Sequence, residues 1–194
     1  MRRLIRIALI AVASVACLVA ALVVLDRTGL LQFNTESGFS MAPTLPPCGG
    51  GRVIAEGFTY RFRDPRRGEI VVFHASGTVG ARLTPDRHGK LGVNKRVIGL
   101  PGETVSWKAN RVYANGKKVD DIPTTVFHSV HLGEDEYFVL GDNRSASTDS
   151  RDFGPVPRDA IFARVVLIVW PLYRIGAPVY DKTSRPLGQL CSFS

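Results

Sequence analysis

Cysteine, acidic residues and long apolar runs are all scarce in this sequence. Its 194 residues include only three cysteines, which excludes a disulfide-rich scaffold. Only one stretch is long and apolar enough to cross a bilayer, so a polytopic membrane protein is excluded. No long segment beyond residue 30 has the apolar periodicity of a helix, and 12 prolines and 19 glycines supply many turns, so a helical bundle is excluded as well.

Acidic residues are outnumbered, because 25 Lys and Arg against 17 Asp and Glu give a net charge of +8. Three of the arginines precede the apolar stretch, and the rest of the chain carries +5. This excess either attracts the chain to anionic lipid or forms an ordinary solvated basic face. Nucleic acid is not an expected partner, because no recognition helix or RNA-binding motif accompanies the charge.

The apolar stretch runs from Ile7 to Leu25 without a charge. Its 19 residues would reach roughly 28 Å as a helix, close to the thickness of the bilayer core. Because three arginines precede the stretch, the positive-inside rule predicts that the N-terminus stays in the cytoplasm. The expected organisation is a tail over residues 1–6, a transmembrane helix over 7–25 and a domain over 33–194 outside the cell membrane.

Other interpretations of the apolar stretch are a cleaved signal, a lipoprotein signal and a buried core helix. A cleaved signal would have an apolar core of about 7–15 residues, and Val19-Ala20-Ala21 only loosely fits its cleavage site. Cys17 faintly suggests a lipoprotein signal, but eight apolar residues follow it. A core helix that is apolar all round fits poorly at the N-terminus behind three arginines. An uncleaved anchor is therefore favoured.

From residue 33 on, short β-branched and aromatic runs bounded by Gly, Pro or Asp predict strands. Asn115-Gly116 between two such runs is a strong hairpin signal, because both turn positions need a positive φ. We expect a mainly β, antiparallel domain, with a small β insertion over about residues 104–132. The predicted strands are Arg52–Ala55, Glu69–Phe73, Val93–Ile98, Thr104–Trp107, Arg111–Ala114, Lys117–Val119, Tyr137–Leu140 and Ile161–Trp170. The stretch from His74 to Gly92 is expected to be a surface loop or a splayed hairpin.

Three polar clusters carry the candidate chemistry: the bend around Ser40, the strand edge at Lys95, and the loop Gly141–Arg151. A serine hydroxyl is a poor nucleophile until a base removes its proton. None of the four histidines lies in a recognisable triad motif. A lysine can replace histidine only when neutral, and burial in apolar surroundings lowers the pKa of a lysine. Residue chemistry alone leaves two hypotheses, a Ser40–Lys95 dyad or a turn serine with an unrelated surface lysine.

Four blocks follow one another in the order nucleophile, strand, lysine and polar loop. They are Ser40-Met41-Ala42-Pro43-Thr44-Leu45, Arg67-Gly68-Glu69-Ile70-Val71-Val72-Phe73, Lys95-Arg96-Val97-Ile98-Gly99-Leu100-Pro101-Gly102-Glu103, and Gly141-Asp142-Asn143-Arg144 with Ser147 and Asp149-Ser150-Arg151. Together they resemble type I signal peptidases, membrane-anchored serine proteases that remove signal peptides. One block alone would be weak evidence for the resemblance, but four blocks in this order are specific to the family. Together with the membrane anchor, the resemblance covers nearly the whole chain.

The resemblance implies a role for each matching residue. Ser40 would be the nucleophile, Lys95 its general base, and Ser147 the residue that hydrogen-bonds and orients the lysine. Asp149 and Arg151 would stiffen the site loop through an ion pair, worth only about 0–1 kcal/mol if exposed. The other implied residues are Asp142, Asn143 and Arg144, which would shape the same loop, and Met41 and Leu45, which would line the pocket for the small side chain before the cut.

Two features depart from some relatives of that family. Gly38 stands where some members have a serine that serves as a second oxyanion donor, so this chain would need a substitute donor. Asn34-Thr35-Glu36 is more polar than the strand that many relatives pair with the substrate backbone.

The resemblance implies an acyl-enzyme mechanism with no metal and no organic cofactor. The expected partners are exported preproteins with small residues before the cut, and the lipid bilayer. Self-cleaving repressors share a Ser–Lys β domain, but residues 1–30 leave no room for their DNA-binding domain. A peptidase dedicated to one substrate such as a pilin, and an inactive tethered binding module, stay open as alternatives. Cys48 and Cys191 could form a disulfide outside the cell or be unrelated thiols.

Overall fold

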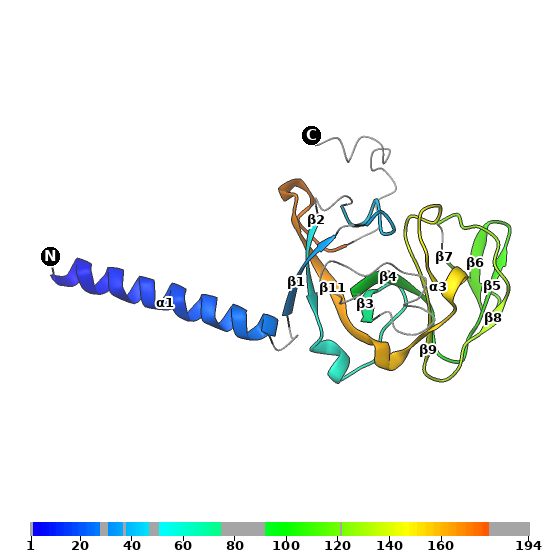
Figure 1. The fold of residues 1–194 in the computed structure, drawn as a ribbon, viewed down its shortest axis with the longest axis horizontal. Coiled ribbons are helices and arrows are strands. Elements are labelled where there is room, and N and C mark those ends of the chain that lie inside the picture. The colour runs from blue at the N-terminus through cyan, green and yellow to red at the C-terminus, as the bar shows by residue number, and fades with distance from the viewer. Residues whose placement is uncertain are drawn as a thin grey trace.

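The structure is a computed structural model that describes residues 2–27, 31–36, 38–46, 51–74, 92–120 and 122–178. A single long helix projects from a body made of two antiparallel sheets (Figure 1). The two expected strand-rich regions therefore form two distinct sheets.

The N-terminal helix, α1 (Arg2–Arg27), includes a stretch from Arg3 to Val24 that is long and apolar enough to cross a membrane. None of that stretch is buried against the rest of the protein. A helix that is apolar on every face is stable when lipid covers it, and it does not pack here as a core helix would. The arrangement fits a membrane-anchored protein, with the two sheets beyond the end of the helix (Figure 1).

The larger sheet has seven strands in the order β1-β2-β11-β3-β4-β9-β10. Its central strands alternate buried and less buried residues, as expected for a sheet with one face on the core. The strand β1 lies at one end of the order and pairs with β2. The bounds are β1 (Leu31–Glu36), β2 (Gly51–Glu56), β3 (Ile70–His74), β4 (Gly92–Gly99), β9 (Glu136–Leu140), β10 (Val156–Pro157) and β11 (Ile161–Trp170).

The smaller sheet has four strands in the order β7-β6-β5-β8. Asn115 and Gly116 turn β6 into β7 with φ values of 47° and 77°, which is the positive-φ turn that the sequence predicts. The two sheets come close at Gly99, where an added Cβ would lie 2.4 Å from a Val105 methyl carbon. The bounds are β5 (Thr104–Lys108), β6 (Arg111–Ala114), β7 (Lys117–Asp120) and β8 (Val130–His131).

The core consists of three clusters of buried side chains. One lies under β2, β3 and β11 and includes Met41 and Leu45 from the segment that follows β1. A second lies under β3, β4 and β9. The third joins Ile98 and Phe138 of the larger sheet to Val105 of the smaller sheet. Because apolar packing continues from one sheet to the other, it holds the smaller sheet against the larger one.

The predicted strands are all observed, most with ends shifted by a residue or two. The sequence did not predict the two-residue strands β8 and β10 or the one-turn helix α3 (Ser150–Phe153), because such short elements have no periodicity to detect. Three 3₁₀ turns complete the elements: η1 (Thr59–Arg61), η2 (Arg158–Ala160) and η3 (Leu172–Arg174). Residues 75–91 of the expected loop, and both Cys48 and Cys191, lie outside the described residues.

Candidate active site

Ser40 lies in a tight turn that follows β1. The turn is closed by a hydrogen bond from the Ala42 N–H to the Phe39 carbonyl at 3.1 Å. Met41 and Leu45, expected to line a substrate pocket, are 2% and 1% exposed and pack in the core cluster under β2, β3 and β11. Core packing of the residues that follow Ser40 therefore anchors its turn.

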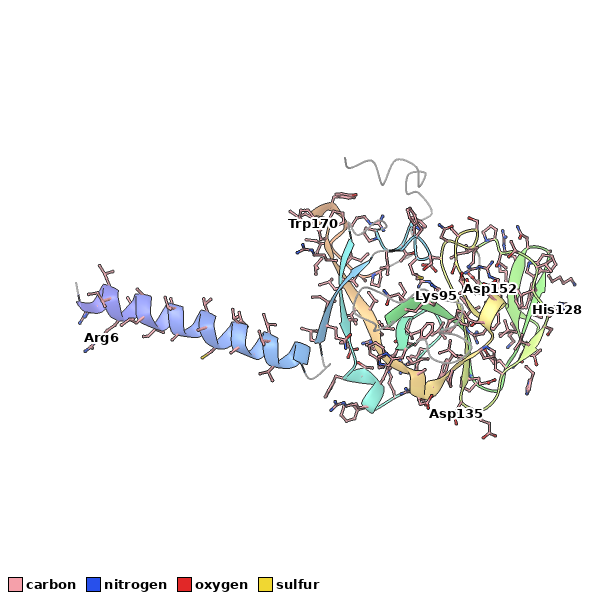
Figure 2. All side chains as sticks on the ribbon, in the orientation of Figure 1. Arg6, Lys95, His128, Asp135, Asp152 and Trp170 are labelled. Carbon is pink, nitrogen blue, oxygen red and sulfur yellow. The ribbon has the colours of Figure 1, made fainter. Side chains whose placement is uncertain are left out.

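Lys95 lies in β4, paired with Val71 of β3, and points toward the Ser40 turn. Its side chain is in the middle of the body (Figure 2), and the residue is only 3% exposed. The Lys95 Nζ and the Ser40 Oγ are 2.7 Å apart and hydrogen-bonded. This distance is within reach for direct proton transfer between a hydroxyl and a neutral amine.

The loop that leaves β9 binds the backbone of the Ser40 turn. The Asn143 N–H donates to the Ser40 carbonyl at 2.9 Å, and the Asn143 side-chain amide donates to the Phe39 carbonyl at 3.1 Å. These two bonds join segments about a hundred residues apart. They hold the backbone of the Ser40 turn against the polar loop.

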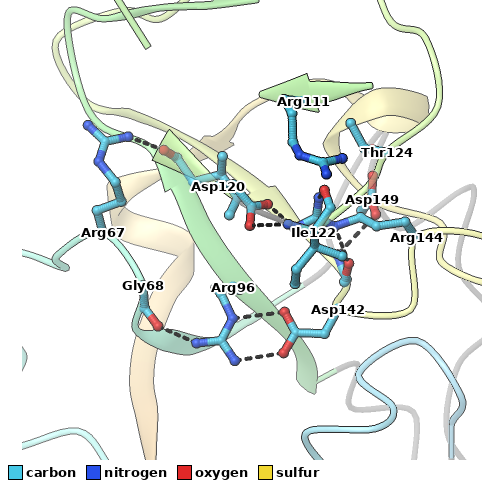
Figure 3. Close-up of polar contacts among 12 residues, drawn as sticks. Arg67, Gly68, Arg96, Arg111, Asp120, Ile122, Thr124, Asp142, Arg144 and Asp149 are labelled. Atoms are coloured by element: carbon cyan, nitrogen blue, oxygen red, sulfur yellow. Dashed lines mark hydrogen bonds and ion pairs between the residues drawn. The ribbon is translucent and has the colours of Figure 1, made fainter. Parts of the chain in front are cut away.

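Asp142 joins the same loop to β4 through a buried ion pair. Both carboxylate oxygens accept from the Arg96 guanidinium, at 2.8 and 2.6 Å, and one also accepts from the Thr44 hydroxyl at 2.5 Å (Figure 3). The Asp142 side chain is fully buried and that of Arg96 is 13% exposed. Because Arg96 follows Lys95 and Thr44 lies in the Ser40 turn, these contacts join the Ser40 turn, β4 and the polar loop.

Arg144 connects the loop to the segment between β7 and β8 of the smaller sheet. Its guanidinium donates to the Gly141 carbonyl at 2.8 Å and to the Ile122 carbonyl at 3.1 Å. It also forms an ion pair with Asp120 at the end of β7 (Figure 3). Arg144 therefore holds residues of both sheets around the site.

Asp149 and Arg151 form a buried ion pair. The small contribution to stability expected of an exposed pair therefore does not apply here. Two hydrogen bonds of 2.8 Å join them, and their side chains are 0% and 8% exposed. Asp149 also caps α3 and accepts from the Gly141 N–H at 3.0 Å. Burial alone would lower the pKa of Arg151, but the hydrogen bonds and charge of Asp149 raise it above its ordinary value. Removing one partner of such a pair typically costs about 3–5 kcal/mol.

The polar loop approaches the Ser40 turn closely at Gly141. A Cβ at this position would lie 2.5 Å from the Ser40 carbonyl oxygen and 2.1 Å from the Ser147 Oγ. Any other residue would therefore push the two segments apart. Ser147 consequently lies beside the Ser40 turn, and its Oγ is buried without a hydrogen-bond partner in the described part of the chain.

Sequence reasoning missed three residues that position the site. Arg96 and Thr44 hold Asp142, and Arg174 of η3 donates to the Pro43 and Thr44 carbonyls at 2.9 and 3.0 Å. Arg96 and Thr44 stand inside the quoted blocks, but their contacts cannot be read from spacing. Nothing in the sequence around Arg174 marks it as a partner of the turn.

Two histidines in the described part of the chain contact residues other than Ser40. The His74 ring stacks on Phe162 at 4.2 Å, and the His131 Nδ1 lies 3.1 Å from the Thr104 hydroxyl. Within residues that the structure describes, no group of three or more His, Cys, Asp or Glu could hold a metal ion.

The family model described as "Signal peptidase, peptidase S26" matches residues 6–170. The chain is 41% identical over 157 residues to "Probable signal peptidase I-2" of Synechocystis sp., covering 76% of this chain and 69% of that protein. It is 37% identical over 157 residues to "Signal peptidase I" of Leptolyngbya laminosa, covering 76% and 75%. A crystal structure of a signal peptidase I from Enterococcus faecalis matches with 28% identity over 51% of this chain and 94% of that one, with a TM-score of 0.38.

This chain belongs to the signal peptidase, peptidase S26, family. It is therefore a serine peptidase of the signal peptidase I type, which removes signal peptides from preproteins.

The close approach at Gly141 predicts that Gly141→Ala disrupts the site. The added methyl group must displace the Ser40 carbonyl or Ser147, and overpacking usually costs about 1–3 kcal/mol. We expect a lower melting temperature and a loss of peptidase activity larger than that stability change explains. Gly133→Ala is the matched control, because its Cβ would meet nothing closer than 3.4 Å. Equal activity of the two folded variants would contradict the prediction.

Proposed function

We propose that Ser40 and Lys95 form the catalytic dyad of a membrane-bound endopeptidase that removes N-terminal signal peptides from exported preproteins. The observation that carries this proposal is the 2.7 Å hydrogen bond between the Lys95 Nζ and the Ser40 Oγ in a buried setting. A hydroxyl and an amine brought together from positions 55 residues apart and kept from bulk water are suited to general-base catalysis.

The reaction proceeds in two halves. In the first, neutral Lys95 takes the proton of the Ser40 hydroxyl while the Oγ attacks the scissile carbonyl carbon. The tetrahedral intermediate collapses to an acyl-enzyme, the C–N bond breaks, and the lysine ammonium gives its proton to the departing amine. In the second half, Lys95 activates a water molecule that hydrolyses the ester and regenerates Ser40.

Two groups support the charges that develop. The Ser40 backbone N–H, with a second donor in place of the missing side chain at Gly38, would bind the oxyanion. Ser147 would accept a hydrogen bond from the Lys95 ammonium. Its Oγ is buried beside the Ser40 turn without a partner, and an unsatisfied buried hydroxyl typically costs about 1–3 kcal/mol. The Ser147 hydroxyl would gain a hydrogen bond when Lys95 becomes charged, which would offset this cost.

The substrate would bind as an extra β-strand. The strand β1 pairs only with β2 among the described strands, so its outer edge offers backbone groups just before Ser40. Alternate side chains of an extended substrate point to the same face, so the first and third residues before the cut would face the enzyme together. Met41 and Leu45 fill the space beneath the turn, which leaves room for small side chains only.

Two alternatives can be weighed against this proposal. An inactive tethered module has no use for a lysine buried against a serine, so the geometry disfavours it. A peptidase dedicated to a single substrate would share the same dyad and differ in which preproteins it accepts.

The first prediction from this proposal concerns the dyad. Ser40→Ala and Lys95→Ala should each lower the rate of preprotein cleavage by roughly 10⁴-fold or more. The double variant should cleave no more slowly than either single variant, because neither residue supports the reaction without the other. Cleavage of a model preprotein by the full-length enzyme in detergent measures this. Lys108→Ala, at an exposed position in β5, is the control for loss of a lysine.

The pH dependence follows from the same assignment. Lys95 accepts the proton only when neutral, so the cleavage rate should fall as the pH drops and the ammonium form accumulates. Near wild-type turnover by folded Lys95→Ala, or activity that keeps rising in acid, would exclude the lysine base.

The second prediction concerns specificity. Small residues such as Ala, Ser or Gly directly before the cut and at the third residue before it should be required, because larger ones would have to displace core side chains. Overpacking of this kind usually costs about 1–3 kcal/mol. A panel of preproteins with single changes at those positions measures it. Cleavage after Leu or Phe as fast as after Ala would refute the pocket argument.

The third prediction concerns topology. The helix α1 should remain attached to the mature protein, with residues 33–194 outside the cytoplasmic membrane, because the arginines at its start favour the inside. Protease added to spheroplasts should digest the sheet domain. In intact inside-out vesicles the sheet domain should face the lumen, so the same protease should spare it. A mature form that begins near Ala21, or at a lipid-modified Cys17, would contradict the anchor.

A further inference from the structure

A cavity of about 330 Å³ opens between the Ser40 turn and the segment that connects β7 to β8 of the smaller sheet. Its volume lies within the roughly 300–1,000 Å³ typical of ligand pockets. Ala42 and Pro43 form one wall, Asn143 and Ser145 another, and residues 122–125 the third. Ala42 is two residues from Ser40, and the Asn143 N–H is bonded to the Ser40 carbonyl, so the cavity is adjacent to the nucleophile.

The cavity and β1 lie on different sides of the Ser40 turn. The strand β1 precedes Ser40 in the chain and lies on the α1 side of the body, whereas the smaller sheet lies at the opposite end (Figure 1). An extended substrate that pairs with β1 before the cut must leave the nucleophile on the other side after it. The cavity lies on this exit side, away from the membrane helix.

The walls of the cavity carry charges that are already paired. Asp142 is neutralised by Arg96, and Arg144 by Asp120 (Figure 3). The groups left at its rim are uncharged, among them the side chains of Thr125 and Ser145 and the ring of Pro123. A cavity of this kind suits short, uncharged or weakly polar side chains in an extended chain.

We propose that this cavity, termed the mature-side cavity, binds the first two or three residues that follow the scissile bond. The inference rests on the proposed function, since it assigns a subsite to the same reaction. Binding there positions the amine that leaves when the Ser40 ester forms, so that this nitrogen receives the proton from Lys95. The mature-side cavity thus selects preproteins by the start of their mature sequence as well as by their signal peptide.

Thr125→Trp is one test variant, because residue 125 lines the cavity and is exposed, so an indole there can narrow the cavity without entering the core. It also removes a hydroxyl that accepts a hydrogen bond from Arg151 at 2.7 Å, so a second variant is needed that keeps this bond. Pro123→Trp fills the same cavity from a neighbouring exposed position and guards against a local folding defect. Val126→Trp is the matched control, since Val126 is 68% exposed and does not line the cavity.

The full-length enzyme in detergent is assayed with two substrates that share one signal peptide. One continues into a mature sequence with Ala, Leu or Phe at its first two positions, and the other ends in an ethyl ester with no mature residues. Both filling variants should lower the ratio of peptide to ester cleavage about tenfold, most for Leu and Phe, while Val126→Trp should leave it unchanged.

The outcomes separate the two proposals. A ratio that stays at the wild-type value in both filling variants, or that falls equally in Val126→Trp, overturns the mature-side cavity. If the wild type cleaves neither substrate, or Ser40→Ala still cleaves both, the proposed function itself fails.

Discussion

The site depends on burying a lysine amine against a serine hydroxyl. The 2.7 Å contact between Lys95 and Ser40 requires that a strand and a turn, 55 residues apart, keep a fixed distance. Three sets of interactions meet this requirement. The strand β4 is paired with β3 and β9, the turn is anchored in the core by Met41 and Leu45, and the polar loop is bonded to both. A shift of any one would separate the Lys95 Nζ from the Ser40 Oγ.

Charges around the site are buried in pairs. Arg96 with Asp142 and Arg151 with Asp149 each share two hydrogen bonds between a planar guanidinium and a carboxylate, and Arg144 adds a third pair with Asp120. Buried pairs of this geometry contribute little net stability, since the desolvation of both charges opposes their attraction. Their contribution is geometric, because two N–H groups of a guanidinium can both donate to one carboxylate only in a fixed arrangement. The pairs therefore determine the shape of the loop that binds the nucleophile turn.

The arrangement of the parts suits a substrate that shares the membrane. The helix α1 and the edge strand β1 lie at one side of the body, and the smaller sheet lies at the other (Figure 1). The proposed mature-side cavity is lined in part by residues 122–125, which connect two strands of the smaller sheet. A signal peptide held in the same bilayer as α1 would meet Ser40 at a raised effective concentration without any further contact. Its mature chain would then pass across the smaller sheet, which Arg144 connects to the catalytic loop.

The sequence by itself determined the apolar helix, the strands and the four blocks, because these depend on local patterns. A run of β-branched and aromatic residues predicts a strand such as β11, and Asn115-Gly116 predicts the hairpin between β6 and β7 from the conformations that the two residues allow. The order of the blocks also singled out Ser40 and Lys95. Only the tertiary structure decided that Arg96 pairs with Asp142, that the Asp149–Arg151 pair is buried, and that Gly141 must lack a side chain. These features depend on distances between segments far apart in the chain, and such distances result from packing of the whole core, which no local pattern encodes.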